Sequence, residues 1–306
     1  MVRRLIMLAY NQIPQNSFIV ENIKIDSFIS HDEKNIDTKT VESFGKEWTK
    51  FRTFSENEIK IAGDQYFDIV NEAIAGKDSF VLDIGCGTGR WSRYLADKVK
   101  FIEAIDPSDA VFSAVKFNKD KKNFRVTNAS VDNIPFDNDS FDFIMCLGVL
   151  HHIPDTESAL QNAVKKLKPQ GHILLYLYYD LENRGFLYRS LFFISGILRR
   201  IISSMPYRLK FLICEIIAFS IYLPLIASSY FVKIIFKNNW YKKIPLSYYL
   251  NKSISIIRND ALDRFGTPLE KRFSKSEILA MMKKANLCDI CFSDNEPFWH
   301  VIGKKI

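Results

Sequence analysis

The residues with the clearest chemical meaning lie at 80–90, where an apolar run is followed by an acid and spaced glycines. Residues 80–82 are apolar, as in a buried parallel strand, and Asp83 follows them with a charge. Glycines then stand at every second position: Gly85, Gly87 and Gly89. A backbone without Cβ atoms lets a ligand approach the main chain, and a helix starting near Arg90 would present free N–H groups. The segment predicts that a small molecule binds at the carboxyl edge of an open α/β sheet.

A second acid, Asp106, ends another predicted strand, at 101–105, and is followed by Pro107 and Ser108. A carboxylate at this place can accept hydrogen bonds from both hydroxyls of a ribose. The alternative is that Asp106 caps the helix predicted at 108–118. Since Ser108 is able to cap that helix, we expect Asp106 to be left for the ligand.

Two adjacent histidines, His151 and His152, follow a strand predicted at 141–147. A neutral imidazole can remove a proton from a substrate hydroxyl near neutral pH. His152 is the preferred base, because His151 is expected to continue the strand edge. The alternative is that one of the histidines only packs or caps the next helix.

Strands and helices alternate over most of the chain, which predicts an α/β fold with a parallel, doubly wound sheet. Strands are predicted at 80–84, 101–105, 124–128, 141–147 and 172–179, with helices at 90–98, 108–118 and 156–167. After an insertion, a capping-box pattern at Ser274 and Glu277 opens a helix at 275–285. Two adjacent strands, at 287–293 and 298–304, end the chain.

These strand ends resemble the motifs of class I S-adenosylmethionine-dependent methyltransferases. The glycines run G-x-G-x-G after an acid, unlike the dinucleotide pattern G-x-G-x-x-G, and they resemble the family's first motif, which wraps the methionine end of the cofactor. Residues 139–155 resemble its fourth-strand motif, where the strand tip faces the transferred methyl group. The resemblance covers 79–180 and 270–305, and is to a small-molecule methyltransferase domain like those of ubiquinone and menaquinone biosynthesis. It implies a Rossmann-like, seven-stranded, mostly parallel sheet with an antiparallel last strand and a helical insertion after strand five.

The resemblance also implies the cofactor, S-adenosyl-L-methionine, and the residues that hold it. They are Asp83, Gly85, Gly87, Gly89, Asp106, Pro107, Ser130, Val131 and Leu147. Ser130 stands where the family usually has the aspartate that takes the adenine amine, and a serine hydroxyl accepts that bond more weakly. The sulfonium carries its own leaving group, so no metal site is expected. Orientation and exclusion of water should supply most of the rate, with His152 as the base for a hydroxyl acceptor.

Three parts are expected along the chain: an N-terminal arm and helical lid at 1–75, a cofactor-binding core at 76–180 and 263–306, and a helical insertion at 181–262. The arm at 1–40 reads as loosely structured, with strand-like pieces such as 18–25. The segment 41–75 reads as helical, with aromatic residues including Trp48 at three- to four-residue spacing. Whether these aromatic residues form a lid over the cofactor or pack into the core stays open.

The insertion is both apolar and basic. Residues 184–258 carry twelve Lys or Arg and one acid, in a chain whose net charge is +7. An uncharged run at 216–232 is interrupted by Pro224 and is short for a bilayer span. A buried helical cap over the active site is favoured, and its character suits a saccharide or lipid-linked acceptor. The alternatives are an interfacial contact of 186–237 with anionic lipid and, least favoured, a transmembrane span.

Other features of the sequence limit the functions that the chain can have. Five scattered cysteines are typical of a reduced, intracellular protein, and the C-x-x-C at Cys288 and Cys291 lacks a second pair for zinc. The apolar run at 5–9 is shorter than that of a secretory signal. The fourth-strand segment lacks the motifs of nucleic-acid methylases, so no nucleic-acid partner is expected. The sequence predicts a cytoplasmic O- or N-methyltransferase of a small molecule. The alternative is a catalytically silent cofactor-binding or membrane-associated scaffold protein.

Overall fold

A computed structural model describes residues 7–30, 32–50, 54–182, 184–236 and 239–306. The chain divides into two compact units, which are described separately below. The first combines the chain up to Asp180 with Leu269–Ile306, and the second is Leu181–Pro268.

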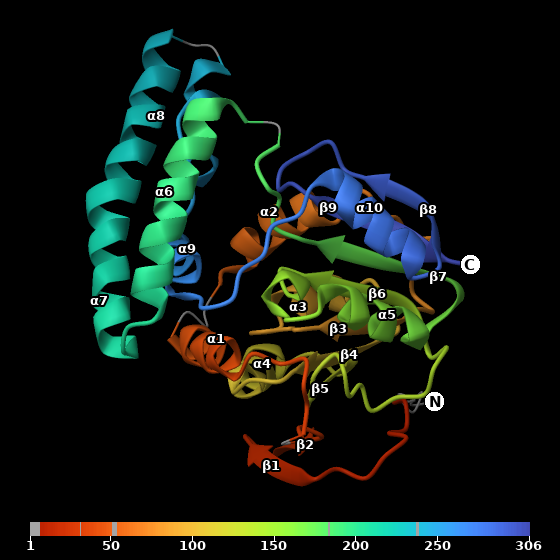
Figure 1. The fold of residues 1–306 in the computed structure, drawn as a ribbon. Helices are drawn as coiled ribbons and strands as arrows, with labels where there is room; N and C mark the ends of the chain where they lie inside the picture. Colours follow the sequence, from red (N-terminus) through yellow and green to blue (C-terminus); the bar gives the residue numbers. More distant parts are fainter. Residues whose placement is uncertain (1–6, 31, 51–53, 183, 237–238) are drawn as a thin grey trace. The chain divides into compact units, whose positions relative to one another are not determined.

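The first unit is built on a nine-stranded sheet in the order β1-β2-β5-β4-β3-β6-β7-β9-β8 (Figure 1). Its centre is parallel and consists of β5 (Phe124–Asn128), β4 (Phe101–Asp106), β3 (Phe80–Ile84), β6 (Phe141–Leu147) and β7 (Leu167–Tyr176). The last strand, β9 (His300–Lys305), runs antiparallel between β7 and β8 (Leu287–Phe292). These seven strands confirm the predicted doubly wound fold with an antiparallel last strand.

Two further strands come from the N-terminal arm, which was expected to be loosely structured with strand-like pieces such as 18–25. They are β1 (Asn16–Val20) and β2 (Ile23–Ser27), which form an antiparallel hairpin. β2 pairs in parallel with β5, where Ser27 Oγ donates to Asn128 Oδ1 at 2.7 Å. The Phe28 N–H also donates to the Asn128 carbonyl, at 2.8 Å. The hairpin thus joins the sheet at the carboxyl end of β5, at Asn128.

Helices cover both faces of the sheet, as the alternation of strands and helices predicts. On one face, Leu82 and Ile84 of β3 pack with α5 (Thr156–Lys166) and α10 (Lys275–Lys284). On the other face, Val81 packs with α3 (Arg90–Ala96). α4 (Ala110–Asn118) packs against β4 and β5. Since β3 is buried on both sides, its apolar run places Asp83 on the face of α3.

The segment 41–75 is not helical throughout. α1 spans Thr38–Lys50 and α2 spans Glu56–Tyr66, where Ser55 and Glu58 form a capping box. Beyond Tyr66 the chain turns, because the Asn71 side chain accepts the N–H groups of Ala73 and Ile74 at 3.0 and 3.2 Å. An asparagine that bonds its own neighbouring backbone in this way favours a turn over a helix.

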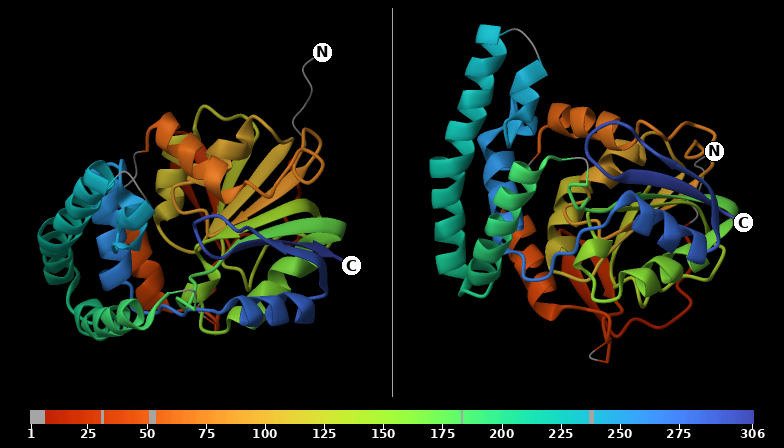
Figure 2. Two further views of the ribbon diagram at one scale, coloured as in Figure 1. Left: turned by 90° about the horizontal axis from the view of Figure 1, so that it is seen from above. Right: turned by 45° about the horizontal axis from the view of Figure 1, so that its top comes forward.

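The second unit is helical. Its elements are α6 (Phe186–Ser203), α7 (Tyr207–Ile217), the π-turn η2 (Ala218–Tyr222), α8 (Leu223–Phe236), the 3₁₀ turns η3 (Asn239–Lys243) and η4 (Ser247–Tyr249), and α9 (Ile254–Gly266). Figure 2 shows α6 beside the continuous helix formed by α7 and α8. Pro224 does not break this helix, because the wider π-turn before it accommodates the missing N–H.

The uncharged run at 216–232 was expected to be buried. This expectation is wrong, because the helix that contains the run is mostly not buried. Tyr207–Phe236 is thirty residues long, and 22% of its most apolar window is buried. It is the one helix of the described residues whose length and composition would allow it to cross a membrane. The other side chains of that window are half-buried or exposed, so packing within this unit accounts for only part of the apolar run.

Candidate functional site

The glycine loop links β3 to α3 and has a left-handed backbone at each glycine. The φ angles are 68° at Gly85, 55° at Gly87 and 74° at Gly89. The N–H groups of Gly85 and Cys86 both donate to the Ile105 carbonyl, at 2.8 and 3.0 Å. The loop therefore bends over the end of β4 and lies beside Asp106.

Alanine at Gly85 should destabilise the protein for two separable reasons. The left-handed backbone is unfavourable for a side chain, and a Cβ would lie 2.4 Å from Val149 Cγ2. We expect the free energy of unfolding in urea to fall by about 2–4 kcal/mol. Val149→Ala should relieve the steric component, so the double variant should be more stable than the sum of the two losses predicts. Strictly additive losses would contradict the close contact.

Asp83 is 1% exposed and lies beneath the loop, where it accepts a hydrogen bond from Ser92 Oγ at 2.7 Å. Burial raises the pKa of Asp83 to about 7; the Ser92 bond opposes this rise and the nearby Asp106 adds to it. The side chain thus ties β3 to α3. We propose that Asp83 serves the cofactor by holding the loop in place.

The raised pKa of Asp83 should make the cofactor-free protein less stable as pH rises from about 4 to about 7. Over this range the folded state keeps a proton that the unfolded chain has released, which lowers stability by up to about 1.4 kcal/mol per pH unit. Above that range the loss is complete. In urea unfolding, Asp83→Asn should flatten this slope, whereas Asp78→Asn, at an exposed acid, should keep it. Equal slopes for Asp83→Asn and the wild type would refute the assignment.

Asp106 ends β4 with its carboxylate turned to the loop. Oδ2 accepts the Gly87 N–H at 2.9 Å, and Oδ1 accepts the N–H and hydroxyl of Ser108 at 2.9 and 2.6 Å. Burial raises the pKa of Asp106, and the bonds from Ser108 and Gly87 counteract this rise. Across half-buried Pro107, Ser108 Oγ accepts the Ala110 N–H at 3.2 Å and so serves α4. Since each carboxylate oxygen has more than one lone pair, Asp106 can still accept bonds from a ligand.

The segment after β5 lies against the end of β4. The Ala129 N–H and the Asn128 side-chain amide donate to the Asp106 carbonyl, at 3.2 and 2.9 Å. Ser130 and Val131 follow directly and are each 6% exposed. Ser130 Oγ accepts the Asp132 N–H at 3.2 Å, which leaves its hydroxyl proton and a second lone pair. The structure therefore brings Asp106, Ser130 and Val131 to one edge of the sheet.

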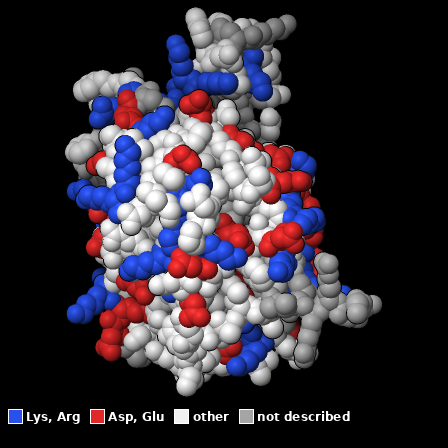
Figure 3. All heavy atoms as spheres, turned by 90° about the vertical axis from the view of Figure 1, so that its right-hand side faces the viewer, with Lys and Arg blue, Asp and Glu red and all other residues white. Residues whose placement is uncertain are grey.

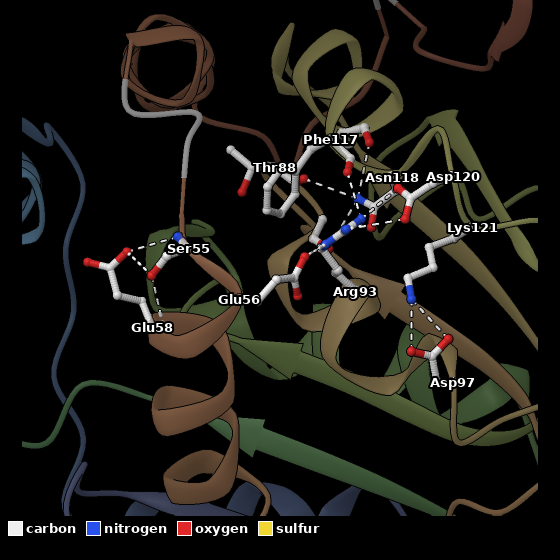
Figure 4. Close-up of polar contacts among 12 residues, drawn as sticks. Ser55, Glu56, Glu58, Thr88, Arg93, Asp97, Phe117, Asn118, Asp120 and Lys121 are labelled. Atoms are coloured by element: carbon white, nitrogen blue, oxygen red, sulfur yellow. Dashed lines mark hydrogen bonds and ion pairs between the residues drawn. The ribbon is translucent and has the colours of Figure 1, made fainter.

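Polar side chains hold the glycine loop from the side of α3 and α4 (Figure 4). The Asn118 amide donates to the carbonyls of Thr88 and Gly89, at 3.4 and 3.3 Å. Arg93 joins Glu56 of α2 to Asp120, at 2.6 and 2.8 Å. Asn118 thus ties the loop to α4, while Arg93 links α3 to α2 and to Asp120, and the sequence motif did not reveal these contacts.

The chain leaves β6 at Leu147 by a sharp turn. Gly148 has a φ of 82°, and its N–H donates to the Tyr176 carbonyl at 3.1 Å. Leu150–His152 then form the 3₁₀ turn η1, so His151 does not continue the strand as expected. His151 is fully buried and stacks on the Tyr178 ring with centroids 3.8 Å apart. Burial lowers the pKa of His151 well below its usual range, so this ring is neutral.

Hydrogen bonds distinguish the two ring nitrogens of each histidine. His152 Nδ1 lies 2.7 Å from the Leu269 carbonyl, which can only accept, so Nδ1 carries a proton, and in the neutral form of this ring Nε2 has the lone pair. The Tyr178 N–H donates to His151 Nδ1 at 3.4 Å, so Nε2 of His151 carries its proton. We therefore propose His152 rather than His151 as the base, for a different reason from the one that the sequence offered.

α1 lies across this edge of the sheet. A Cβ on Gly45 would be 3.3 Å from the Asp109 nitrogen, and one on Gly87 would be 3.2 Å from Trp48 Nε1. The Phe44 ring lies 4.8 Å from the His152 ring. α1 thus contacts the start of α4, the glycine loop and His152. Its aromatic residues pack against the protein, and its role as a lid over a bound cofactor is a proposal.

Two contributions to the site come from the chain that returns after the helical unit. Leu269 supplies the carbonyl that sets the His152 tautomer, and Arg272 lies 5.1 Å from the centre of the Tyr178 ring. The sequence analysis missed both residues, and only their position in the fold reveals them. For Leu269 the reason is that a backbone carbonyl has no signature in a sequence.

Comparisons with known proteins match this arrangement to one family. A family model described as a methyltransferase domain matches residues 82–175, from β3 into β7. A tRNA U34 carboxymethyltransferase of Nautilia profundicola is 30% identical over 175 residues, which is 54% of this chain. A ubiquinone biosynthesis O-methyltransferase of Coxiella burnetii is 27% identical over 119 residues, or 38% of this chain. The chain spans 58% of the length of the first relative and 49% of the second.

A solved structure, of a putative methyltransferase from Bacillus halodurans, aligns with 76% of this chain and 71% of its own, at 16% identity and a TM-score of 0.47. The family match is more specific, because residues 82–175 include the acidic strand end, the glycine loop, Asp106 and both histidines. Residues 82–175 of this chain thus form a methyltransferase domain of the class I S-adenosylmethionine-dependent type, and S-adenosylmethionine is the cofactor of that domain.

Proposed function

We propose that this chain transfers a methyl group from S-adenosylmethionine to an oxygen or nitrogen atom of a small-molecule acceptor. A saccharide or a lipid-linked intermediate is the acceptor class that the proposal names. The observation that carries the proposal is the tautomer of His152, whose Nδ1 is bonded to the Leu269 carbonyl and whose Nε2 is therefore basic in the neutral ring. A base at the end of β6 is what a hydroxyl acceptor needs.

The residues of the sheet edge fit the cofactor. The glycines have left-handed backbones and no Cβ atoms, so a ligand can approach the main chain of the loop. Asp106, beside the loop, offers carboxylate oxygens to a ribose diol. The backbone N–H of Val131 and the hydroxyl of Ser130 suit the adenine edge, and the tip of β6 at Leu147 suits the methyl end. When bound, the cofactor supplies a methyl group on a positively charged sulfur.

The chain itself then has three tasks. The loop and Asp106 orient the donor, and His152 accepts the proton that a hydroxyl loses when its oxygen forms the new C–O bond. Phe44 and Trp48 on α1, packed against His152 and the loop, exclude water from this edge. Methyl transfer is accelerated mainly by holding the reacting atoms in line and by excluding water from them.

The acceptor class can be tested with S-adenosylmethionine carrying a tritiated methyl group. The full chain is incubated with a cell extract, which is then separated into a solvent-soluble, a water-soluble and an RNA fraction. We expect His152-dependent label in the solvent-soluble or water-soluble fraction. Label in tRNA would replace the small-molecule proposal by the acceptor class named for the Nautilia relative. Tight cofactor binding without label in any fraction would instead support a silent scaffold protein.

A further inference from the structure

The helical unit exposes an unusual amount of apolar surface. Nineteen of the twenty-five exposed large apolar side chains among the described residues belong to Leu181–Pro268. Single exposed apolar residues are normal at a protein surface, but contiguous patches mark interaction sites. This unit therefore carries a surface that the fold of the unit does not itself use.

The exposed side chains form one stripe on each of two neighbouring helices. On α6 the stripe consists of Leu191, Ile194, Leu198 and Ile201, and on α7 with η2 of Leu209, Leu212, Ile216 and Phe219. The spacing of i, i+3, i+7 and i+10 is the same on both helices and places each stripe on one side. Both helices also contact α9, which occupies their inner sides. The stripes therefore belong to the outer side of the unit.

The charges around the stripes are almost all positive. Glu215 is the one acidic residue between 186 and 236, and it forms an ion pair with Arg258 of α9 at 2.8 Å. Exposed cations lie near both ends of the helix pair: Arg200 and Arg208 at the connection between α6 and α7, and Arg189, Lys233, Lys242 and Lys243 toward the opposite end. On the face drawn in Figure 3, by contrast, acidic and basic side chains are interspersed. The outer side of the helix pair thus carries apolar residues together with cations, and its described residues include no acidic residue that neutralises these cations.

We propose that α6 and the α7–α8 helix lie flat on an anionic membrane surface. The apolar stripes enter the boundary between headgroups and acyl chains, while the flanking Arg and Lys residues contact lipid phosphates. A spanning orientation is disfavoured because charged residues lie on the α7–α8 helix itself: Lys210, bonded to the Gly266 carbonyl at 2.8 Å, and Glu215, paired with Arg258 of α9. The proposal concerns binding alone, and it does not depend on methyl transfer.

Flotation of the full chain with vesicles tests this proposal. We expect the protein to float with vesicles of phosphatidylglycerol and phosphatidylcholine, to lose binding as salt rises, and to stay unbound with phosphatidylcholine alone. Leu212→Gln/Ile216→Gln removes two exposed apolar side chains and should weaken binding about a hundredfold. Arg200→Gln/Arg208→Gln should weaken it about 25-fold.

Matched variants in the first unit separate a local effect from a general loss of apolar or charged surface. Ile13→Gln/Ile61→Gln replaces two exposed apolar residues, and Lys122→Gln/Lys283→Gln replaces two exposed cations. Both should bind vesicles as the wild type does, and all variants should keep their affinity for S-adenosylmethionine. Failure of the wild type to float, or equal losses in control and test variants, would overturn the proposal. The wild type could instead fail to bind vesicles and form dimers that Leu212→Gln/Ile216→Gln dissociates. That result would assign the stripes to a contact between two copies of this chain.

Discussion

Replacing His152 by alanine should lower kcat for a hydroxyl acceptor by about 10²–10⁴-fold and leave the affinity for S-adenosylmethionine unchanged. The reason is the fixed tautomer: because Nδ1 is bonded to the Leu269 carbonyl, Nε2 is the atom able to accept the proton that the acceptor releases. The measurement is single-turnover methyl transfer with saturating cofactor, using the acceptor found by tritium labelling.

A second variant decides whether the loss reflects proton transfer. His152→Gln retains a polar side chain of similar reach without a titratable nitrogen, so it should be as slow as the alanine variant. A glutamine variant with nearly full kcat would show that His152 only packs against Phe44.

Replacing Asp106 by alanine should weaken S-adenosylmethionine binding at least about tenfold in a calorimetric titration, since a hydrogen bond to a charged group is worth about 1.5–3 kcal/mol. The carboxylate has two tasks at this edge. It accepts the Gly87 N–H at 2.9 Å, which shapes the loop, and it has lone pairs left for a ribose.

Further ligands and variants separate these tasks. S-Adenosylhomocysteine has the same ribose, so its affinity should fall by the same factor. Asp106→Asn keeps one carbonyl oxygen and should lose less affinity than Asp106→Ala. The neighbouring acid Asp109 is exposed, and Asp109→Ala should bind the cofactor normally. Unchanged affinity in Asp106→Ala would remove Asp106 from the site.

The parallel core was predictable because its signals are local. A strand buried on both faces must be apolar along its length, as at 80–82, and a left-handed loop after it selects glycine at positions 85, 87 and 89. The carboxyl ends of parallel strands lie on one edge of a sheet, so Asp83, Asp106 and the histidines were expected together. The capping residues Ser274 and Glu277 likewise marked the start of α10.

Other features depend on contacts between distant segments, and the sequence pattern did not determine them. The N-terminal hairpin is ordered by Asn128, about one hundred residues away. η1 replaces the expected continuation of β6, and it places His151 against Tyr178 and His152 against Leu269. No local pattern encodes these partners, because a hydrogen bond to a backbone carbonyl requires only that the carbonyl be near.

The sequence by itself determined that the chain has a glycine loop, an acid at the end of the second core strand and a class I methyltransferase core. Only the tertiary structure decided which His152 nitrogen is bonded to the Leu269 carbonyl and how exposed the apolar run of the insertion is. Both depend on burial and on partners contributed by remote segments. A run of apolar residues is compatible with a buried cap or an exposed stripe, and the choice depends on which faces the neighbouring helices cover. In this protein α9 covers the inner faces of α6 and α7, and the outer faces remain exposed.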